Sequence, residues 1–441
     1  MEDFMAKKQS SSQRKRRSKG ISRGKRTARV ALVLIEAVMI LILSVGCYAV
    51  SILGKMERED IDLSSLYVYT GQNDSLVPQM TDVNGNVPEQ TSAEQPETIA
   101  EAVQTTAEQR ETGAWSVNVK SETTGPEVIV EQSDLMQHVN LVNGYWNILI
   151  CGVDARANEP LSSGDYRADV IMVCSINATT KEVKLLSVYR DTIMYQPSSK
   201  TYVKANDAIF RPFGGGISEI ISTINLNMDL NITDAIIVNW AALALVVNCL
   251  GGLELEITPE EISKSIITGF LTEVVNETGI GTDSQFSTPG LQLCDGPKVV
   301  AYCRNRQTTG SDFGRTNRQR EVVEKLLAKA KTADLGTLIQ VISVITGNVY
   351  TTLSMDEMLS LAQDINNYTI GETSGFPSTS ESSQTYLGNW ASDFDIKDPL
   401  VATDLVNNVK VAHQFLFGDD NYQPSQNVQT ISANINSISG F

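Results

Sequence analysis

The sequence predicts an α/β protein, in which a three-layer α/β/α domain with a mixed central sheet follows a single transmembrane helix and a disordered stalk. Three observations support this prediction: a long apolar run near the start of the 441-residue chain, a polar stretch after it, and then short β-branched runs that alternate with helix-like runs. The expected divisions are a basic cytoplasmic tail at 1–29, a transmembrane anchor at 30–53, a flexible extracellular stalk at 54–137 and a folded domain at 138–441.

The anchor is the run at 30–53, which is apolar except for Glu36. A bilayer core about 30 Å thick needs roughly 20 such residues in a helix. A cleaved signal peptide is the weaker alternative, because its apolar run is usually about 7–15 residues and ends at a small-residue cleavage site. Residues 1–29 carry 11 basic and 2 acidic side chains. The positive-inside rule therefore predicts a cytoplasmic N-terminus and a domain outside the cell.

The stalk is expected because its central part is polar and acidic. Residues 71–127 hold 10 acidic and 2 basic side chains and few long apolar runs. Such a segment cannot bury enough apolar surface to offset the entropy of ordering. We therefore expect it to be extended and flexible.

In the folded domain, strands and helices are predicted from the period of the apolar residues. Short apolar runs predict strands at 147–153, 170–176, 183–188 and 235–238. Helical composition predicts helices at 217–226, 241–250 and 316–332. Two capping boxes, Thr258 with Glu261 and Ser354 with Glu357, indicate further helix starts.

Composition excludes several classes of protein. Residues 30–441 carry 24 basic and 50 acidic side chains, and so acidic a body is a poor nucleic-acid binder because affinity for nucleic acid depends on neutralising phosphates. The chain has only two histidines, His138 and His413, which rules out most catalytic zinc sites. Five cysteines follow the anchor, with no CxxC pair among them. We expect no disulfide, with a bond between Cys294 and Cys303 as the alternative, and no thiol redox chemistry.

The arginines of the folded domain are unevenly placed. Nine lie after residue 138, and none follows Arg320. The guanidinium fork suits phosphate or carboxylate, so the clustering indicates an anion site, with salt bridges to the many acids as the alternative. Spacing favours the anion site. Arg304 and Arg306 point to one face if their segment is extended, and Arg315 and Gln319 share one face of a helix.

Two carboxylates are predicted to lie at strand ends, where ligands of α/β sheets usually bind. Asp154 closes one predicted strand, and Asp169 opens the next, two residues after Arg167. Carboxylate oxygens suit Mg²⁺, and guanidinium groups suit the remaining charge of a diphosphate. The combination predicts a Mg²⁺–diphosphate site.

Six short motifs, taken in chain order, resemble those of the LytR-CpsA-Psr family of cell-wall glycopolymer transferases. They are NILICGVDAR (147–156), RAD (167–169), LLSVYRD (185–191), KAN (204–206), AYCRNR (301–306) and DFGRTNRQ (312–319). Tyr189 stands where the family usually has proline, and Cys303 where an aliphatic or aromatic residue is more common. Neither change removes a charged residue of the motifs.

The resemblance implies a phosphotransferase that moves a glycopolymer from a polyprenyl-diphosphate carrier onto a peptidoglycan sugar hydroxyl at the cell membrane of a Gram-positive-type bacterium. Its partners would be the lipid-linked glycopolymer, the peptidoglycan acceptor and membrane lipid, and no nucleic acid. By motif match, Asp154 and Asp169 would hold Mg²⁺, and Asp154, Arg190 and Asp191 would be catalytic. The diphosphate would be bound by Arg167, Arg190, Lys204, Arg304, Arg306, Arg315 and Gln319.

Several alternatives stay open at this point. Either Asp154 or Asp191 could accept the proton of the attacking hydroxyl. The family also holds the prenyl chain in an apolar tunnel, and residues 217–250 and 335–361 are apolar enough to line one, although such runs are also typical of a plain core. The same charged site would serve a polyprenyl-diphosphate phosphatase. The third hypothesis is a non-catalytic regulator of the cell envelope that binds the lipid carrier.

Overall fold

A computed structural model describes residues 57–61, 66–67 and 144–439, except for gaps at 156–159, 214, 264–265, 306–310, 346, 355–356, 359–360, 362–363 and 379–398. All described residues belong to one compact unit that comprises residues 52–441. The predicted tail, the anchor at 30–53 and most of the stalk lie outside the described residues. Among the described residues, no helix is long and apolar enough to cross a membrane.

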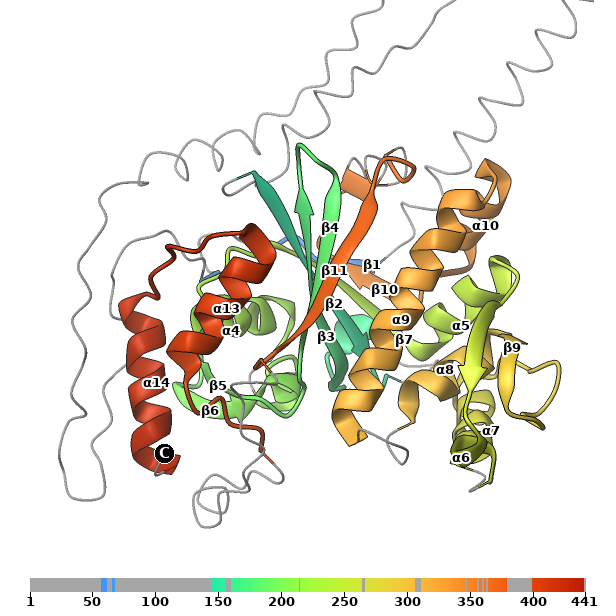
Figure 1. Ribbon diagram of the computed structural model, residues 1–441, viewed down its shortest axis with the longest axis horizontal. Helices are drawn as coiled ribbons and strands as arrows, with labels where there is room; N and C mark the ends of the chain where they lie inside the picture. Colours follow the sequence, from blue (N-terminus) through green and yellow to red (C-terminus); the bar gives the residue numbers. More distant parts are fainter. Residues whose placement is uncertain are drawn as a thin grey trace, which may run out of the picture. The chain divides into compact units, whose positions relative to one another are not determined.

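Seven strands form the central sheet (Figure 1). In order across the sheet they are β1 (Glu57–Arg58), β10 (Val349–Thr351), β7 (Asp234–Asn239), β2 (Tyr145–Val153), β3 (Ala168–Asn177), β4 (Glu182–Val188) and β11 (Thr369–Phe376). β2 is parallel to β7 and antiparallel to β3, which is in turn antiparallel to β4. The sheet is therefore mixed, as predicted, and the carboxyl ends of β2, β4 and β7 lie at one edge together with the start of β3.

The strands are apolar on both sides because the sheet is buried on both sides. In β2, Trp146 and Ile148 belong to one core cluster, whereas Leu149, Cys151 and Val153 belong to another. Successive side chains of a strand point to opposite faces, so a strand covered on both faces becomes a continuous apolar run. This burial explains why all four predicted strands are confirmed, each within two residues of its expected bounds.

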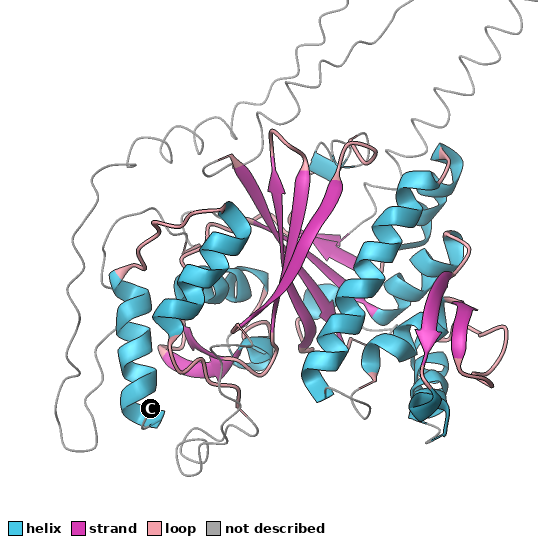
Figure 2. Cartoon of the chain, in the orientation of Figure 1, coloured by secondary structure: helices cyan, strands magenta, loops and turns pink. Residues whose placement is uncertain are grey.

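One face of the sheet is covered by α4 (Ile217–Met228), α13 (Leu405–Phe417) and α14 (Gln426–Ser439) (Figure 2). The predicted helix at 217–226 is confirmed as α4, which begins after Gly216 at a φ of 146°. A short hairpin of β5 (Ile193–Gln196) and β6 (Thr201–Lys204) packs beside α4. Apolar side chains of these helices and of β2 form the largest core cluster.

The other face is covered by the helices between β7 and β10 (Figure 1). They are α5 (Trp240–Cys249), α6 (Pro259–Ser263), α7 (Ile266–Thr278), α8 (Gly296–Arg304), α9 (Ser311–Thr332) and α10 (Leu335–Ile345), with a hairpin of β8 (Leu253–Ile257) and β9 (Gly290–Cys294). Several of them share a core cluster of their own. The helices predicted at 241–250 and 316–332 are confirmed as α5 and α9.

Both predicted capping boxes are formed. Glu261 Oε2 accepts hydrogen bonds from the Thr258 N–H at 2.8 Å and from the Thr258 hydroxyl at 3.0 Å. Glu357 Oε2 accepts the equivalent pair from Ser354, each at 2.7 Å. In return, the Glu261 N–H donates to Thr258 Oγ1 at 3.3 Å and the Glu357 N–H donates to Ser354 Oγ at 3.2 Å. These reciprocal bonds satisfy backbone donors that the first turn of a helix leaves free.

Two short pieces of the predicted stalk belong to the folded unit instead. Residues 57–58 pair in parallel with 350–351, which makes them the edge strand β1. Leu66 is buried in the largest core cluster, and the Tyr67 N–H donates to Ser222 Oγ at 3.1 Å. A flexible stalk from residue 54 is therefore wrong for these pieces. Their partners lie far along the chain, so local composition could not reveal the contacts.

Candidate functional site

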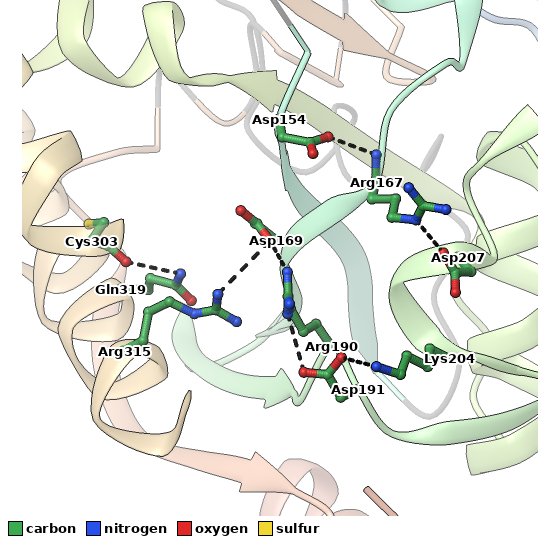
Figure 3. A network of polar contacts seen from close by, with 10 residues as sticks. All are labelled: Asp154, Arg167, Asp169, Arg190, Asp191, Lys204, Asp207, Cys303, Arg315 and Gln319. Atoms are coloured by element: carbon green, nitrogen blue, oxygen red, sulfur yellow. Dashed lines mark hydrogen bonds and ion pairs between the residues drawn. The ribbon is translucent and has the colours of Figure 1, made fainter. Parts of the chain in front are cut away.

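The two carboxylates expected at strand ends lie where β2 ends and β3 begins (Figure 3). Asp154 directly follows β2, and Asp169 is the second residue of β3. The Asp154 N–H donates to the Arg167 carbonyl at 3.3 Å, and the Arg167 N–H donates to Asp154 Oδ1 at 2.8 Å. These bonds continue the β2–β3 ladder by one step. They hold Asp154 at the edge, where it is exposed to solvent.

Arg190 lies just past β4 and joins two carboxylates (Figure 3). Its Nη1 forms an ion pair with Asp169 Oδ1, and its Nε donates to Asp191 Oδ2 at 3.2 Å. Lys204, the last residue of β6, donates to Asp191 Oδ1 at 2.8 Å. These side chains are only 15% to 20% exposed. Charges so far removed from water need this kind of pairing, and the result is an alternating row of negative and positive groups.

Arg167 points away from that row. Its Nε donates to Asp207 Oδ1 at 2.5 Å, and its guanidinium carbon lies 4.5 Å from the centre of the Phe210 ring. Sequence reasoning missed Asp207, although it follows the KAN motif at 204–206 by one residue. The structure therefore places Arg167 at the outer rim of the charged network.

Helix α9 brings Arg315 and Gln319 to the other side of Asp169 (Figure 3). Both are buried, as two residues on one face of a helix packed against the sheet. Arg315 Nη1 lies 3.9 Å from Asp169 Oδ1, and Gln319 Nε2 donates to the Cys303 carbonyl at 3.4 Å. Asp169 thus contacts cations from both β4 and α9.

Arg304 is the last residue of α8, so the expected extended segment is wrong at this position. A helix continues to residue 304 because α8 packs against α5, α7 and α9. The Arg304 guanidinium carbon lies 3.4 Å from the centre of the Trp240 ring and 5.7 Å from that of Phe270. Its nitrogens also pair with Glu273 at 3.3 Å and Glu277 at 3.5 Å. Arg306 lies outside the described residues.

A cavity of about 540 Å³ lies between the sheet and the helices α5, α7, α8 and α9. Most of its wall is apolar, and the polar side chains Asp169, Arg304, Arg315 and Gln319 stand among the lining residues. The complete lining is Ile150, Gly152, Asp169, Val170, Val238, Asn239, Trp240, Leu243, Phe270, Val300, Cys303, Arg304, Arg315, Gln319, Val322 and Val323. The cavity therefore joins an apolar chamber to the charged network.

The expected tunnel ranges are only partly represented in this wall. Residues 238–243 come from the range 217–250, whereas none of the described lining residues comes from 335–361. Helix α10 packs on α5 instead. Sequence reasoning missed Phe270 as a wall residue, and it did not single out Trp240 within the range 217–250. For Trp240 a signal existed, because it lies two residues after the strand predicted at 235–238, and that strand, β7, ends at the same sheet edge as Asp154.

The donor set at this edge fits a divalent cation that arrives with a diphosphate. Three carboxylates, from Asp169, Asp191 and Asp207, contact cationic side chains there, and the Asp154 carboxylate accepts the Arg167 backbone N–H. No group of three or more His, Cys, Asp or Glu side chains suited to a metal exists in the described part of the chain. Mg²⁺ commonly binds through one or two carboxylates and takes its other ligands from substrate phosphates and water. The carboxylates of Asp154 and Asp169 are therefore ligands of the type and number that Mg²⁺ takes from a protein.

Cys303 contributes a thiol to the cavity wall, and its buried environment does not favour a nucleophilic thiolate. Burial raises the pKa of this thiol to about 12. A nucleophilic cysteine needs a thiolate near neutral pH, which requires a lowered pKa. Every cysteine in the described ranges is free, as expected. Cys303 therefore serves as a small apolar residue of the wall.

Comparison with known proteins decides the family. The model of the LytR_cpsA_psr family matches residues 98–392 of this chain. The chain belongs to the LytR-CpsA-Psr family. The match confirms the resemblance that the six motifs indicate, and it includes every motif of the charged network.

Relatives within the LytR-CpsA-Psr family carry different names. The chain is 28% identical over 253 residues to the polyisoprenyl-teichoic acid–peptidoglycan teichoic acid transferase TagU of Enterococcus faecalis, which covers 57% of this chain and 75% of that protein. It is 24% identical over 248 residues to biofilm regulatory protein A of Streptococcus mutans, and the match spans about half of each protein, 55% in both cases.

A solved structure supports the fold of this family member. The crystal structure of protein gbs0355 from Streptococcus agalactiae superposes with a TM-score of 0.50 at 18% identity, over 67% of this chain and 94% of that one. At this level of identity the likeness concerns the fold alone. It agrees with a mixed sheet flanked by helices on both faces.

Proposed function

We propose that this protein is a phosphotransferase that moves a glycopolymer from a polyprenyl-diphosphate carrier onto a peptidoglycan sugar hydroxyl and leaves polyprenyl phosphate. Family membership and the name of the TagU relative support the class of reaction. The observation that carries the proposal is the cavity, because its apolar wall meets two arginines, the buried Arg315 and the half-buried Arg304. A ligand that fits both parts has a long apolar chain and an anionic head, as a prenyl diphosphate has.

The apolar part of the cavity suits the prenyl chain. Val238, Leu243, Val300 and Val322 contribute hydrocarbon from four different elements, and burial of each CH₂ group stabilises binding by about 0.8 kcal/mol. Gly152 keeps the strand side of the cavity open. A Cβ at this position would lie 3.0 Å from the Val170 side chain.

The charged part suits the diphosphate. Arg190 and Arg315 flank Asp169, and Arg304 stands in the same cavity wall. Phosphoryl transfer requires mainly that the groups are positioned and that the developing charge is neutralised. Guanidinium groups supply both, because their planar fork holds two phosphate oxygens in a fixed direction.

The reaction balances without a covalent enzyme intermediate. The oxygen of the acceptor hydroxyl forms a bond to the phosphorus that carries the glycopolymer, and the bond from that phosphorus to the bridging oxygen of the diphosphate breaks. The bridging oxygen leaves on polyprenyl phosphate. Asp154 and Asp191 are the two carboxylates proposed to accept the hydroxyl proton, and Asp154 is the more exposed of the two.

We further propose that Asp154 and Asp169 hold Mg²⁺ when the diphosphate is bound. The ion would supply positive charge between two carboxylates and a polyanion that would otherwise repel each other. We also propose that residues 30–53 anchor the chain with its N-terminus in the cytoplasm and the domain outside. The supporting observations are the apolar run and the basic residues before it.

A single assay distinguishes the three proposed functions, which are a transferase, a phosphatase and a non-catalytic regulator. The full-length protein in detergent is given a polyprenyl-diphosphate-linked saccharide and a peptidoglycan acceptor, and both polyprenyl phosphate and acceptor-bound saccharide are measured. We expect the two products in equal amounts. Release of polyprenyl phosphate without labelled acceptor would indicate a phosphatase. Binding of the lipid without formation of either product would indicate a non-catalytic regulator that binds the lipid carrier.

A further inference from the structure

A buried ion pair lies next to Arg304 and takes no part in the charged network described above. Glu261, from α6, is 0% exposed, and the Arg318 side chain, from α9, is 12% exposed. Between them lies Asn305, which is also fully buried and directly follows Arg304 at the end of α8. Burying a carboxylate is costly, so a site that keeps one has its other donors arranged around it.

Glu261 and Arg318 hold Asn305 at two points. Asn305 Nδ2 donates to Glu261 Oε1 at 2.9 Å, and Arg318 Nη1 donates to the Asn305 carbonyl at 3.0 Å. Arg318 Nη2 closes the triangle with Glu261 Oε1 at 3.2 Å. The other carboxylate oxygen of Glu261 accepts the capping-box bonds from Thr258. Each oxygen of the carboxylate thus has two donors.

The same helix also holds the residue on the other side of Arg304. Gln319 Nε2 donates to the Cys303 carbonyl. Arg304 therefore lies between two carbonyls that are bonded to consecutive residues of α9. At Asn305 the chain leaves the helix, with φ −66° and ψ 118°. The backbone at this point sets the direction of the Arg304 side chain, because the last turn of a helix has few bonds of its own to hold it.

A helix start does not by itself need contacts of this kind. Glu357 occupies the same capping-box position after Ser354 and is likewise buried, at 4% exposed. It lies in the stretch between β10 and β11, in a different part of the sequence and the fold from α8. Glu261 differs from Glu357 by its bonds to the residue after Arg304.

We propose that Glu261 and Arg318 are positioning residues that hold the Arg304 guanidinium in the cavity wall for the diphosphate. This inference rests on the proposed function, since it assumes that Arg304 meets a diphosphate there. The pair acts through Asn305 and the end of α8. The bonds described above join the pair to Asn305 and Thr258, so loss of the pair weakens recognition of the charged head and spares recognition of the prenyl chain.

The test compares two ligands that differ only in the head group. Binding of octaprenyl diphosphate and of octaprenol to the full-length protein is measured for Arg318→Lys and Glu261→Gln. A lysine keeps the charge but cannot reach the carboxylate and the Asn305 carbonyl together. We expect about tenfold weaker binding of the diphosphate, since a small misplacement of a binding group has effects of this order or larger, with octaprenol binding changed less than about twofold.

Glu357→Gln is the matched control, because it removes the charge of a buried capping-box glutamate elsewhere. It should lower stability to a similar extent and leave the ratio of the two affinities unchanged. Equal loss of both ligands in the Glu261 and Arg318 variants, or a shifted ratio in the Glu357 variant, would overturn the positioning role. If the wild-type protein itself binds the two ligands equally, the proposed function fails instead.

Discussion

The strand-end side and the helical side of the site differ in the groups that surround their positively charged side chains. At the strand ends, Arg167, Arg190 and Lys204 each contact a carboxylate of a neighbouring strand or turn. On the helical side, Arg304 lies on the face of Trp240 in a mostly apolar wall, and it also pairs with Glu273 and Glu277. Glu273 and Glu277 are 56% and 45% exposed, so water screens their charge, whereas the strand-end carboxylates are only 15% to 22% exposed. The Trp240 face fixes the Arg304 guanidinium and leaves its net charge in place.

This difference indicates that the two sides of the site bind different parts of the substrate. The strand-end network is rigid and nearly balanced in charge, so it suits a site that also receives a cation with its substrate. The helical side keeps cationic groups beside hydrocarbon, so it suits a ligand that is apolar over most of its length and anionic at one end. Asp169 is common to both sides, because it contacts Arg190 and Arg315.

The largest effect is expected at the centre of the strand-end network. Arg190→Lys should lower transfer by about 10²–10³-fold, because an ammonium cannot contact Asp169 and Asp191 as a fork and also meet a phosphate. The measurement is polyprenyl phosphate release by the full-length protein. Arg58→Lys, an exposed arginine paired with Asp60, is the control and should keep full activity. Equal activity of the two variants would contradict a catalytic role of Arg190.

The metal hypothesis predicts the next largest effect. Asp154→Asn or Asp169→Asn should lower transfer by about 10²-fold, and EDTA should do the same to the wild-type protein. The asparagine oxygen at position 154 can still accept the Arg167 N–H, so the fold should survive. Asp165→Asn, an exposed acid in the same β2–β3 connection, is the control. Indifference of the wild-type protein to EDTA would remove Mg²⁺ from the proposal.

The apolar side predicts a smaller and more selective effect. Trp240→Ala should weaken binding of octaprenyl diphosphate by about tenfold, since it removes both a wall residue and the aromatic face under Arg304. Binding of inorganic pyrophosphate should fall less, because the prenyl contacts do not contribute to it. Titration of the two ligands measures the ratio of their affinities. An equal loss for both would contradict the proposal that the helical side of the site binds the prenyl chain.

A buried cluster apart from both sides should affect stability and spare activity. Tyr422 donates to Asp229 and stacks on His413 at 3.5 Å. Burial raises the pKa of Asp229 to about 6 from 3.8, and it lowers the pKa of His413 to about 4 from 6.5. The charge of Asp419 acts on His413 in the opposite direction and raises its pKa, but burial has the larger effect. The two groups therefore titrate in the same pH window with opposite consequences.

Between about pH 4 and pH 6 the folded protein holds the Asp229 proton more tightly than the unfolded chain does, so this group's contribution to the free energy of unfolding is lost as pH rises. His413 contributes the reverse, because the unfolded chain is protonated there and the folded one is not. Asp229→Asn should make stability rise more steeply with pH, and His413→Gln should make it rise less, each by on the order of 2 kcal/mol over the window. Denaturant unfolding from pH 4 to pH 7 measures both slopes, and parallel curves would contradict the prediction.

Much of the fold follows from local patterns. Apolar runs, helix composition and capping boxes depend on neighbours within a few residues, and the strands, α4, α5 and α9 lie where these patterns predict them. The meeting of Asp154, Asp169 and Arg190 is also implicit in the sequence. All three lie at the end or start of a strand, and antiparallel neighbours bring such positions to one edge.

Other features depended on the tertiary structure alone. Edge strand β1, the Arg167–Asp207 pair and the contact of Arg304 with Trp240 join residues far apart in the chain. No local period encodes such contacts, because they arise only when the helices pack on the sheet and the cost of burying each charge selects its partner. The sequence by itself thus determined which residues carry the charge and where each strand ends. The packed structure decided which of those charges lie beside hydrocarbon and which carboxylates they contact.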